Sequence, residues 1–119
     1  MAIRDFKELI VWQKAMKLAA EIYRITKKLP KDELYGLTNQ LRRAAVSIPS
    51  NIAEGNGRDS SKEYTRFLLI ARGSRAEVET QLLLCVELGY LEEADIKIAL
   101  DLSTEVAKML NTIISKFRD

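Results

Sequence analysis

The chain has 119 residues, 47% of them hydrophobic and 30% charged, and a net charge of +2, which are the size and balance of one folded domain over residues 1–119. It contains no histidine, which removes the commonest general base and metal ligand, and its single cysteine excludes an internal disulfide and favours a reducing compartment. Because it shows neither the apolar segment of a signal peptide nor a run of about 18 apolar residues for a membrane span, we expect a cytoplasmic protein without membrane contact.

The first predicted helix covers residues 6–28, where apolar residues recur every three or four positions. This predicted core stripe consists of Leu9, Trp12, Met16, Ala19, Tyr23 and Thr26, and it is widened by Ala15, Ile22 and Leu29. Leu29-Pro30 ends the helix, because the residue before a proline disfavours helical geometry.

The second predicted helix starts near Asp32 and carries Pro49 inside its apolar stripe. A proline ring clashes with the carbonyl four residues earlier, here that of Ala45, and removes one helical hydrogen bond, at a cost of about 3 kcal/mol. We therefore predict a kink at Pro49. Asn51 and Glu54 straddle it on one face, within reach of the backbone groups that the proline frees, and we predict a structural role for both.

Capping residues delimit the remaining helices. Gly55-Asn56-Gly57 ends the second helix with residues that tolerate left-handed geometry. Ser60 and Glu63 have the spacing of a capping box for the third helix, and Gly89 is its predicted left-handed end. The fourth helix starts near Glu92. Short connections make neighbouring helices antiparallel, so we predict an all-α fold, an up-down-up-down antiparallel four-helix bundle with a kinked second helix.

The third helix has more apolar residues than one core stripe requires. These additional residues are Leu68, Leu69, Ile70, Leu82, Leu83, Leu84 and Val86. A helix that is apolar nearly all round is either central or shared with another subunit. Because a four-helix bundle has no central helix, burial between subunits is favoured over a wide internal core.

Charge is distributed unevenly along the chain. Residues 1–75 hold fifteen Lys and Arg against eight Asp and Glu, whereas residues 76–119 hold four against nine. Either the two halves attract each other, or the basic half faces an anionic partner. Arginine suits phosphate, so RNA or DNA is the candidate anion. The alternative is ordinary solvated helix faces with ion pairs such as that of Glu63 with Arg66.

No catalytic, metal or cofactor site can be assembled from these residues. Without a histidine nothing activates Cys85, which we interpret as a small buried hydrophobic residue. Gly55-Asn56-Gly57 is not followed by the Lys-Ser/Thr of a phosphate-binding loop. We therefore expect no enzymatic activity, no metal and no cofactor.

Three stretches of sequence are long and distinctive: FKELIVWQKA at residues 6–15, YGLTNQLRRAAVSIPSNIAEG at 35–55, and EVETQL at 77–82 followed by LGYL at 88–91. Together they resemble the four-helix-bundle proteins encoded by intervening sequences in bacterial 23S ribosomal RNA genes. The resemblance implies a ring-like homo-oligomer, a pentamer. It also implies nucleic-acid binding, by analogy with the related accessory variability proteins of diversity-generating retroelements. The basic positions that would carry this binding are Arg42, Arg43, Arg58, Lys62, Arg66 and Arg72.

Two functions remain open at this point. The first is a non-enzymatic, homo-oligomeric bundle that binds RNA or DNA through its Lys and Arg side chains. The alternative is a structural or protein-interaction adaptor, whose apolar and acidic surfaces recruit a protein partner. Salt-dependent retention on nucleic acid distinguishes the two, because only the first depends on phosphate contacts.

Overall fold

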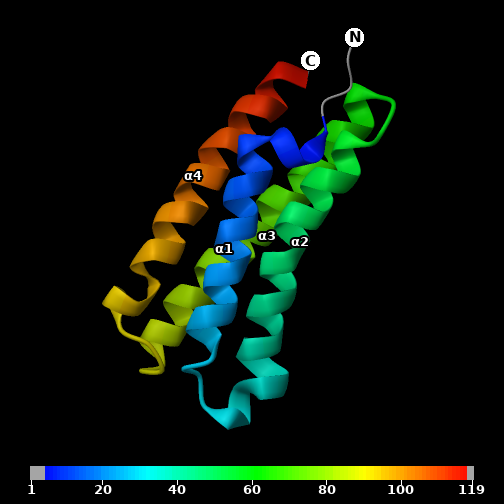
Figure 1. Ribbon diagram of the computed structural model, residues 1–119. Coiled ribbons are helices and arrows are strands. Elements are labelled where there is room, and N and C mark those ends of the chain that lie inside the picture. The colour runs from blue at the N-terminus through cyan, green and yellow to red at the C-terminus, as the bar shows by residue number, and fades with distance from the viewer. Residues whose placement is uncertain (1–4, 118–119) are drawn as a thin grey trace.

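The computed structural model describes residues 5–117, and this part of the chain folds into four long helices joined by short connections. The long helices are α1 (Ile10–Thr26), α2 (Asn39–Asn56), α3 (Ser61–Glu87) and α4 (Glu93–Phe117). Short helical segments precede α1 and α2, namely η1 (Phe6–Glu8), η2 (Lys31–Glu33) and η3 (Leu34–Thr38). Successive helices alternate in direction along a rod of 49 × 23 × 23 Å, and both described chain ends lie at the same end of it (Figure 1).

Each long helix packs against two others, α1 and α3 both lying between α2 and α4. The prediction of an all-α four-helix bundle is therefore confirmed. Aliphatic side chains from all four helices fill its axis. The largest of those that are fully buried are Leu18, Ile22, Ile25, Leu41, Ile48, Ile52, Leu68, Val78, Leu82, Ile96, Val106 and Leu110. None of the helices in residues 5–117 is long and apolar enough to cross a membrane.

The buried face of α1 agrees only in part with the predicted one. Met16 and Tyr23, placed in the core stripe, are 46% and 43% exposed. Ala15, Ala19, Ile22 and Thr26 are buried as predicted, and Val11, Leu18 and Ile25 join them in the core. The reason is that α1 packs between α2 and α4, so the face that points between those two helices is the one removed from water.

The first predicted helix is also interrupted at its start. Leu9 has extended backbone angles (φ −73°, ψ 125°), which separate η1 from α1. Asp5 caps η1 by accepting a hydrogen bond of 2.9 Å from the Lys7 N–H, and the Gln13 side-chain amide donates to the Lys7 carbonyl at 2.9 Å. These local bonds compensate for the break, so the helix begins at Ile10 instead of Phe6.

The second helix begins later than predicted, at Asn39. Gly36 interrupts the preceding turn with non-helical angles (φ −111°, ψ −114°). A carboxylate oxygen of Glu33 accepts the Leu37 N–H at 3.1 Å, and a Cβ at Gly36 would lie 2.6 Å from that oxygen. The Glu33 side chain therefore occupies the space that a larger residue at position 36 would need.

Pro49 is buried within α2, which is helical on both sides of it. The Asn51 amide donates to the Ser47 carbonyl at 2.7 Å and to the Ser47 hydroxyl at 2.9 Å, and that hydroxyl bonds to Ser74 of α3 at 2.8 Å. Asn51 thus supports the turn that contains the proline and links it to α3. Glu54 pairs with Arg58 and takes no part in this network. The kink itself stays a prediction.

The predicted caps are confirmed in part. The Ser60 hydroxyl accepts the Glu63 N–H at 3.1 Å, and Gly89 has a positive φ of 79° after α3, both as expected. Gly57, at the end of α2, has right-handed angles (φ −86°, ψ 0°), so no left-handed cap forms there. A close approach of the helices explains Gly55 instead: an added Cβ would lie 2.7 Å from the Cβ of Phe67.

The extra apolar residues of α3 divide between two environments. Leu68 and Leu82 are fully buried inside the bundle. Ile70, Leu83 and Leu84 are 41%, 49% and 42% exposed, on the outer side of the helix. The internal core therefore accounts for only part of this apolar surface, and the remainder is exposed on the outer side of α3.

Candidate nucleic-acid interface

Two of the predicted basic residues lie on one aromatic ring where α2 turns into α3. The guanidinium of Arg58 lies 4.8 Å from the centre of the Phe67 ring, and that of Arg66 lies 4.4 Å from it. Phe67 is only 6% exposed, so it is a support for the two arginines and offers no open stacking face. The close approach of Gly55 positions this ring against α2.

Carboxylates accompany both arginines. Arg58 pairs with Glu54 at 3.2 Å, and Arg66 donates two bonds of 3.2 Å to Glu63, an ion pair that the sequence predicted. The hydrogen bond from Arg66 holds the pKa of Glu63 below its usual value. Lys62, one turn before Arg66, is exposed. Water screens pairs this exposed, so the arginines can exchange a carboxylate for a phosphate at little cost.

Arg42, which is partly buried, makes its contacts with α1 of the same chain. Its Nε donates to the Thr26 hydroxyl at 2.9 Å, and its guanidinium lies 4.7 Å from the centre of the Tyr23 ring. Both partners belong to the C-terminal end of α1. Arg42 thus pairs with a hydroxyl and an aromatic ring, and it fastens α2 to α1.

The two remaining candidates lie on other faces. Arg43 is exposed and borders a small polar hollow of about 280 Å³ between α2 and α3, together with Ser47 and Glu77. Arg72 extends across to α4 and donates to the side-chain oxygen of Asn111 at 3.1 Å. Since Arg42 lies 14 residues before the end of α2, about 21 Å along the helix, and Arg58 lies beyond that end, the six candidates do not form one compact patch. The group that the fold brings together is Arg58, Lys62 and Arg66.

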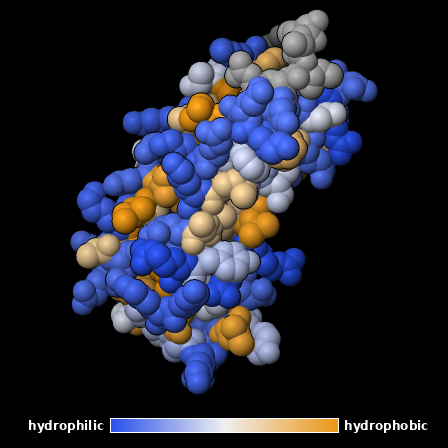
Figure 2. All heavy atoms as spheres, viewed as in Figure 1, coloured by the Kyte–Doolittle hydropathy of each residue, from blue (hydrophilic) through white to orange (hydrophobic). Residues whose placement is uncertain are grey.

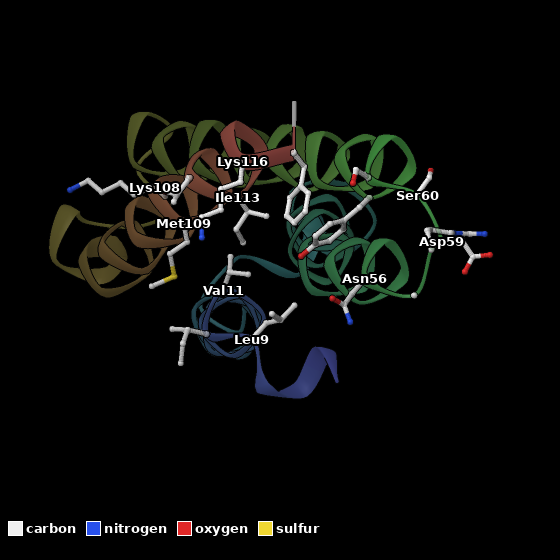
Figure 3. Close-up of a pocket in the computed structure, with 16 residues that line it drawn as sticks. Leu9, Val11, Asn56, Asp59, Ser60, Lys108, Met109, Ile113 and Lys116 are labelled. Carbon is white, nitrogen blue, oxygen red and sulfur yellow. The ribbon is translucent and has the colours of Figure 1, made fainter. Parts of the chain in front are cut away.

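The same end of the bundle contains a hollow of about 870 Å³. Leu9, just before α1, and Val11 of α1 converge on it with Met109 and Ile113 of α4, and Asn56 lies on the opposite side (Figure 3). Further lining residues are Arg58, Asp59, Ser60, Tyr64, Lys108, Thr112, Lys116 and Phe117. The hollow is thus an apolar space with cationic groups at its edge.

Sequence reasoning did not identify the lysines at this hollow. Lys108 and Lys116 are eight residues apart on α4 with Thr112 between them, a spacing that places all three on one helix face. The periodicity was visible in the sequence. That these lysines border a hollow depends on the start of α1 and on the α2–α3 turn, which are distant in the sequence and line other sides of the hollow.

The comparisons with known proteins agree with this architecture. The family model for the 23S rRNA-intervening sequence protein matches residues 7–112, which is most of the chain. The chain belongs to this family. A crystal structure of a protein of unknown function from the S23 ribosomal protein family of Bacteroides thetaiotaomicron is 27% identical, with a TM-score of 0.82 over 88% of this chain and 98% of that one. No curated protein matches the chain. The 23S rRNA-intervening sequence family thus supplies the fold, while the activity has to be argued from the side chains.

Proposed function

We propose that this member of the 23S rRNA-intervening sequence family is a non-enzymatic, cytoplasmic homo-oligomer, a pentamer, that binds RNA or DNA through phosphate contacts. The observation that carries the proposal is the group formed by Arg58, Lys62 and Arg66. Two guanidiniums are held on the ring of Phe67 at 4.8 and 4.4 Å, with side-chain exposures of 45% and 55%. Holding both arginines on one support lowers the entropy cost of placing them against a phosphate.

Exposed apolar side chains support the oligomer. Ile70, Leu83 and Leu84 on α3, together with Leu88 just beyond it, are 41% to 51% exposed. On the face shown in Figure 2, apolar groups alternate with hydrophilic ones and do not form a single uninterrupted patch. The outer face of α3 is the surface that we assign to subunit contact, because apolar residues gather there beyond what the core uses.

The test is binding of a fluorescein-labelled 12-nucleotide poly-dT strand as a function of salt. The variant is Arg58→Gln, Lys62→Gln and Arg66→Gln combined, which removes three positive charges without placing new acids beside Glu54 and Glu63. The matched control replaces Lys27, Lys31 and Lys97 by Gln. These three lysines are exposed; Lys27 and Lys31 belong to the α1–α2 connection and Lys97 to the start of α4, all away from the α2–α3 turn. The control removes the same three positive charges.

We expect the first variant to weaken binding and to reduce the slope of log K against log salt by about 2, while the control keeps most of its affinity and slope. Equal losses in the two triple variants would mean that only net charge matters. Absence of binding by the wild-type protein at low salt would contradict the proposal and favour the adaptor.

The adaptor is the second candidate, and the exposed leucines of α3 are the observation that favours it. Light scattering of the Leu83→Gln and Leu84→Gln variants distinguishes an α3 face that contacts another subunit from one that is free for a different protein partner. Conversion of the oligomer to monomer assigns α3 to subunit contact, as proposed. An oligomer of unchanged mass leaves this face free, and the proposal for α3 is then wrong.

A further inference from the structure

We propose that the hollow at this end of the bundle holds an unpaired nucleobase of a single-stranded nucleic acid, with phosphates of the same strand on the cationic groups at its edge. The inference rests on the proposed nucleic-acid binding and names the form of nucleic acid that is bound. It assigns roles to residues outside the six predicted positions, above all Tyr64, Lys108, Lys116 and Phe117.

The side chains that line the hollow suit a flat aromatic ligand. The rings of Tyr64 and Phe117 meet edge to face, with centres 5.4 Å apart and planes at 63°. Phe117 is 41% exposed and Tyr64 is half-buried, so ring surface remains accessible, unlike that of Phe67. Leu9 and Ile113 add aliphatic surface. The volume of about 870 Å³ is within the range of small-molecule sites, and bases of single strands commonly stack on such aromatic side chains.

Charge complementarity indicates that the ligand also carries negative charges. Lys108 and Lys116 are exposed, and within residues 5–117 neither ammonium pairs with a carboxylate. They lie two turns apart on α4, about 12 Å along the helix. Arg58, in the α2–α3 turn, also lines the hollow, and Asp59 is the one acidic residue among the described lining. An apolar cavity bordered by three cations matches a ligand with an apolar face and negative charges on both sides, as in a nucleotide within a strand.

The same geometry disfavours a duplex. In a double helix the bases are stacked and paired, so one reaches a side pocket only after unstacking, which costs a few kcal/mol. The group of Arg58, Lys62 and Arg66 contacts phosphate alone and accepts either form. A preference for single strands therefore comes from the hollow, and the two contributions are separable by experiment.

The experiment fills the hollow and leaves the cations in place. Thr112 is exposed, borders the hollow and donates its hydroxyl to the Lys108 carbonyl at 3.0 Å. Thr112→Trp therefore occupies the space from the solvent side. Thr104→Trp is the matched control: Thr104 is exposed on the same helix, makes the equivalent 3.0 Å bond to Leu100 and lies outside the hollow. Thermal unfolding of both variants verifies that they fold.

The probes are a labelled 12-nucleotide poly-dT strand, the same backbone with abasic sites throughout, and a 12-base-pair duplex, each titrated at one low salt concentration. We expect the wild type and Thr104→Trp to bind poly-dT at least about fivefold more tightly than the abasic strand, which corresponds to about 1 kcal/mol of base stacking. Thr112→Trp should lose this difference and bind the abasic strand as the wild type does.

Other outcomes overturn the inference in distinguishable ways. If the wild type binds poly-dT and the abasic strand with equal affinity, and binding still depends on salt, then no base occupies the hollow, although the protein binds nucleic acid. A wild-type protein that binds none of the three probes contradicts the proposed function as well. A drop in oligomer mass in Thr112→Trp alone, measured by light scattering, assigns the hollow to a second copy of the chain.

Discussion

Gly55 of α2 and Phe67 of α3 meet so closely that a Cβ added to the glycine would lie 2.7 Å from the Cβ of the phenylalanine. This contact connects the fold with the candidate interface, because Arg58 and Arg66 both lie on the ring of Phe67. The distance between α2 and α3 at this point therefore determines where the two guanidiniums are held.

Gly55→Ala should destabilise the protein by about 1–2 kcal/mol. Alanine gains up to about 1 kcal/mol over glycine inside a helix, but overpacking costs about 1–3 kcal/mol, and here the nearest atom is attached directly to the α3 backbone. Gly73→Ala is the control: no atom lies within 4 Å of its added Cβ, so this variant should gain about 0.5–1 kcal/mol. Urea unfolding of both measures the contrast. A stabilising Gly55→Ala would show that the helices separate freely.

Arg42→Gln should lower stability by about 1 kcal/mol, whereas Arg43→Gln should have little effect. The first change removes a 2.9 Å bond to Thr26 and the stacking on Tyr23, while Arg43 is exposed. Urea unfolding and poly-dT binding should be measured together. If Arg42→Gln lowered the affinity for poly-dT without changing stability, Arg42 would belong to the nucleic-acid interface.

Asp95 should make the protein sensitive to acid. Its pKa is held below the usual value by the backbone N–H of Glu92, which donates to it at 2.9 Å, and secondarily by Lys28 at 2.7 Å. A carboxyl with a lowered folded pKa stabilises fully above the ordinary value of about 3.9, and its contribution is lost as the pH falls through the folded pKa.

Asp95→Asn should therefore unfold at a lower urea concentration than the wild type at pH 6, with the difference shrinking between pH 4 and pH 2. The control is Asp101→Asn, because Asp101 pairs only with Lys97 at 3.2 Å and both side chains are more than 60% exposed. The control should show little difference at any pH. A gap for Asp95→Asn that persists at pH 2 would mean that the charge contributes nothing.

Cys85 should resist alkylation in the native state. It is fully buried, and burial, followed by the negative charge of Glu33, raises the pKa of its thiol. Iodoacetamide at pH 8 should label the native chain at least about 100-fold more slowly than the urea-unfolded chain, since reaction requires opening of the core. Mass spectrometry measures the labelling rates. Comparable rates for the native and the unfolded chain would show that the core around α3 opens readily.

Local signals in the sequence predicted much of the fold. Ser60 with Glu63, and Gly89, delimit α3 as expected, because capping depends on residues within a few positions. The buried stripe of α2 through Leu41 and Ile48 was likewise readable from its period. The break at Leu9 and the late start of α2 at Asn39 were not, because neighbouring side chains compete there for the backbone hydrogen bonds.

The sequence by itself determined the helices, the bundle class and the supply of arginines and lysines, because helix periodicity and charge are properties of neighbouring residues. The tertiary structure alone decided which of those cations share a site. It directed Arg42 to Thr26 across 16 positions, placed Arg58 and Arg66 on one ring, and formed the hollow from segments at the two ends and the middle of the chain. Such contacts depend on how packed helices are rotated about their axes, and that rotation is set by the whole core.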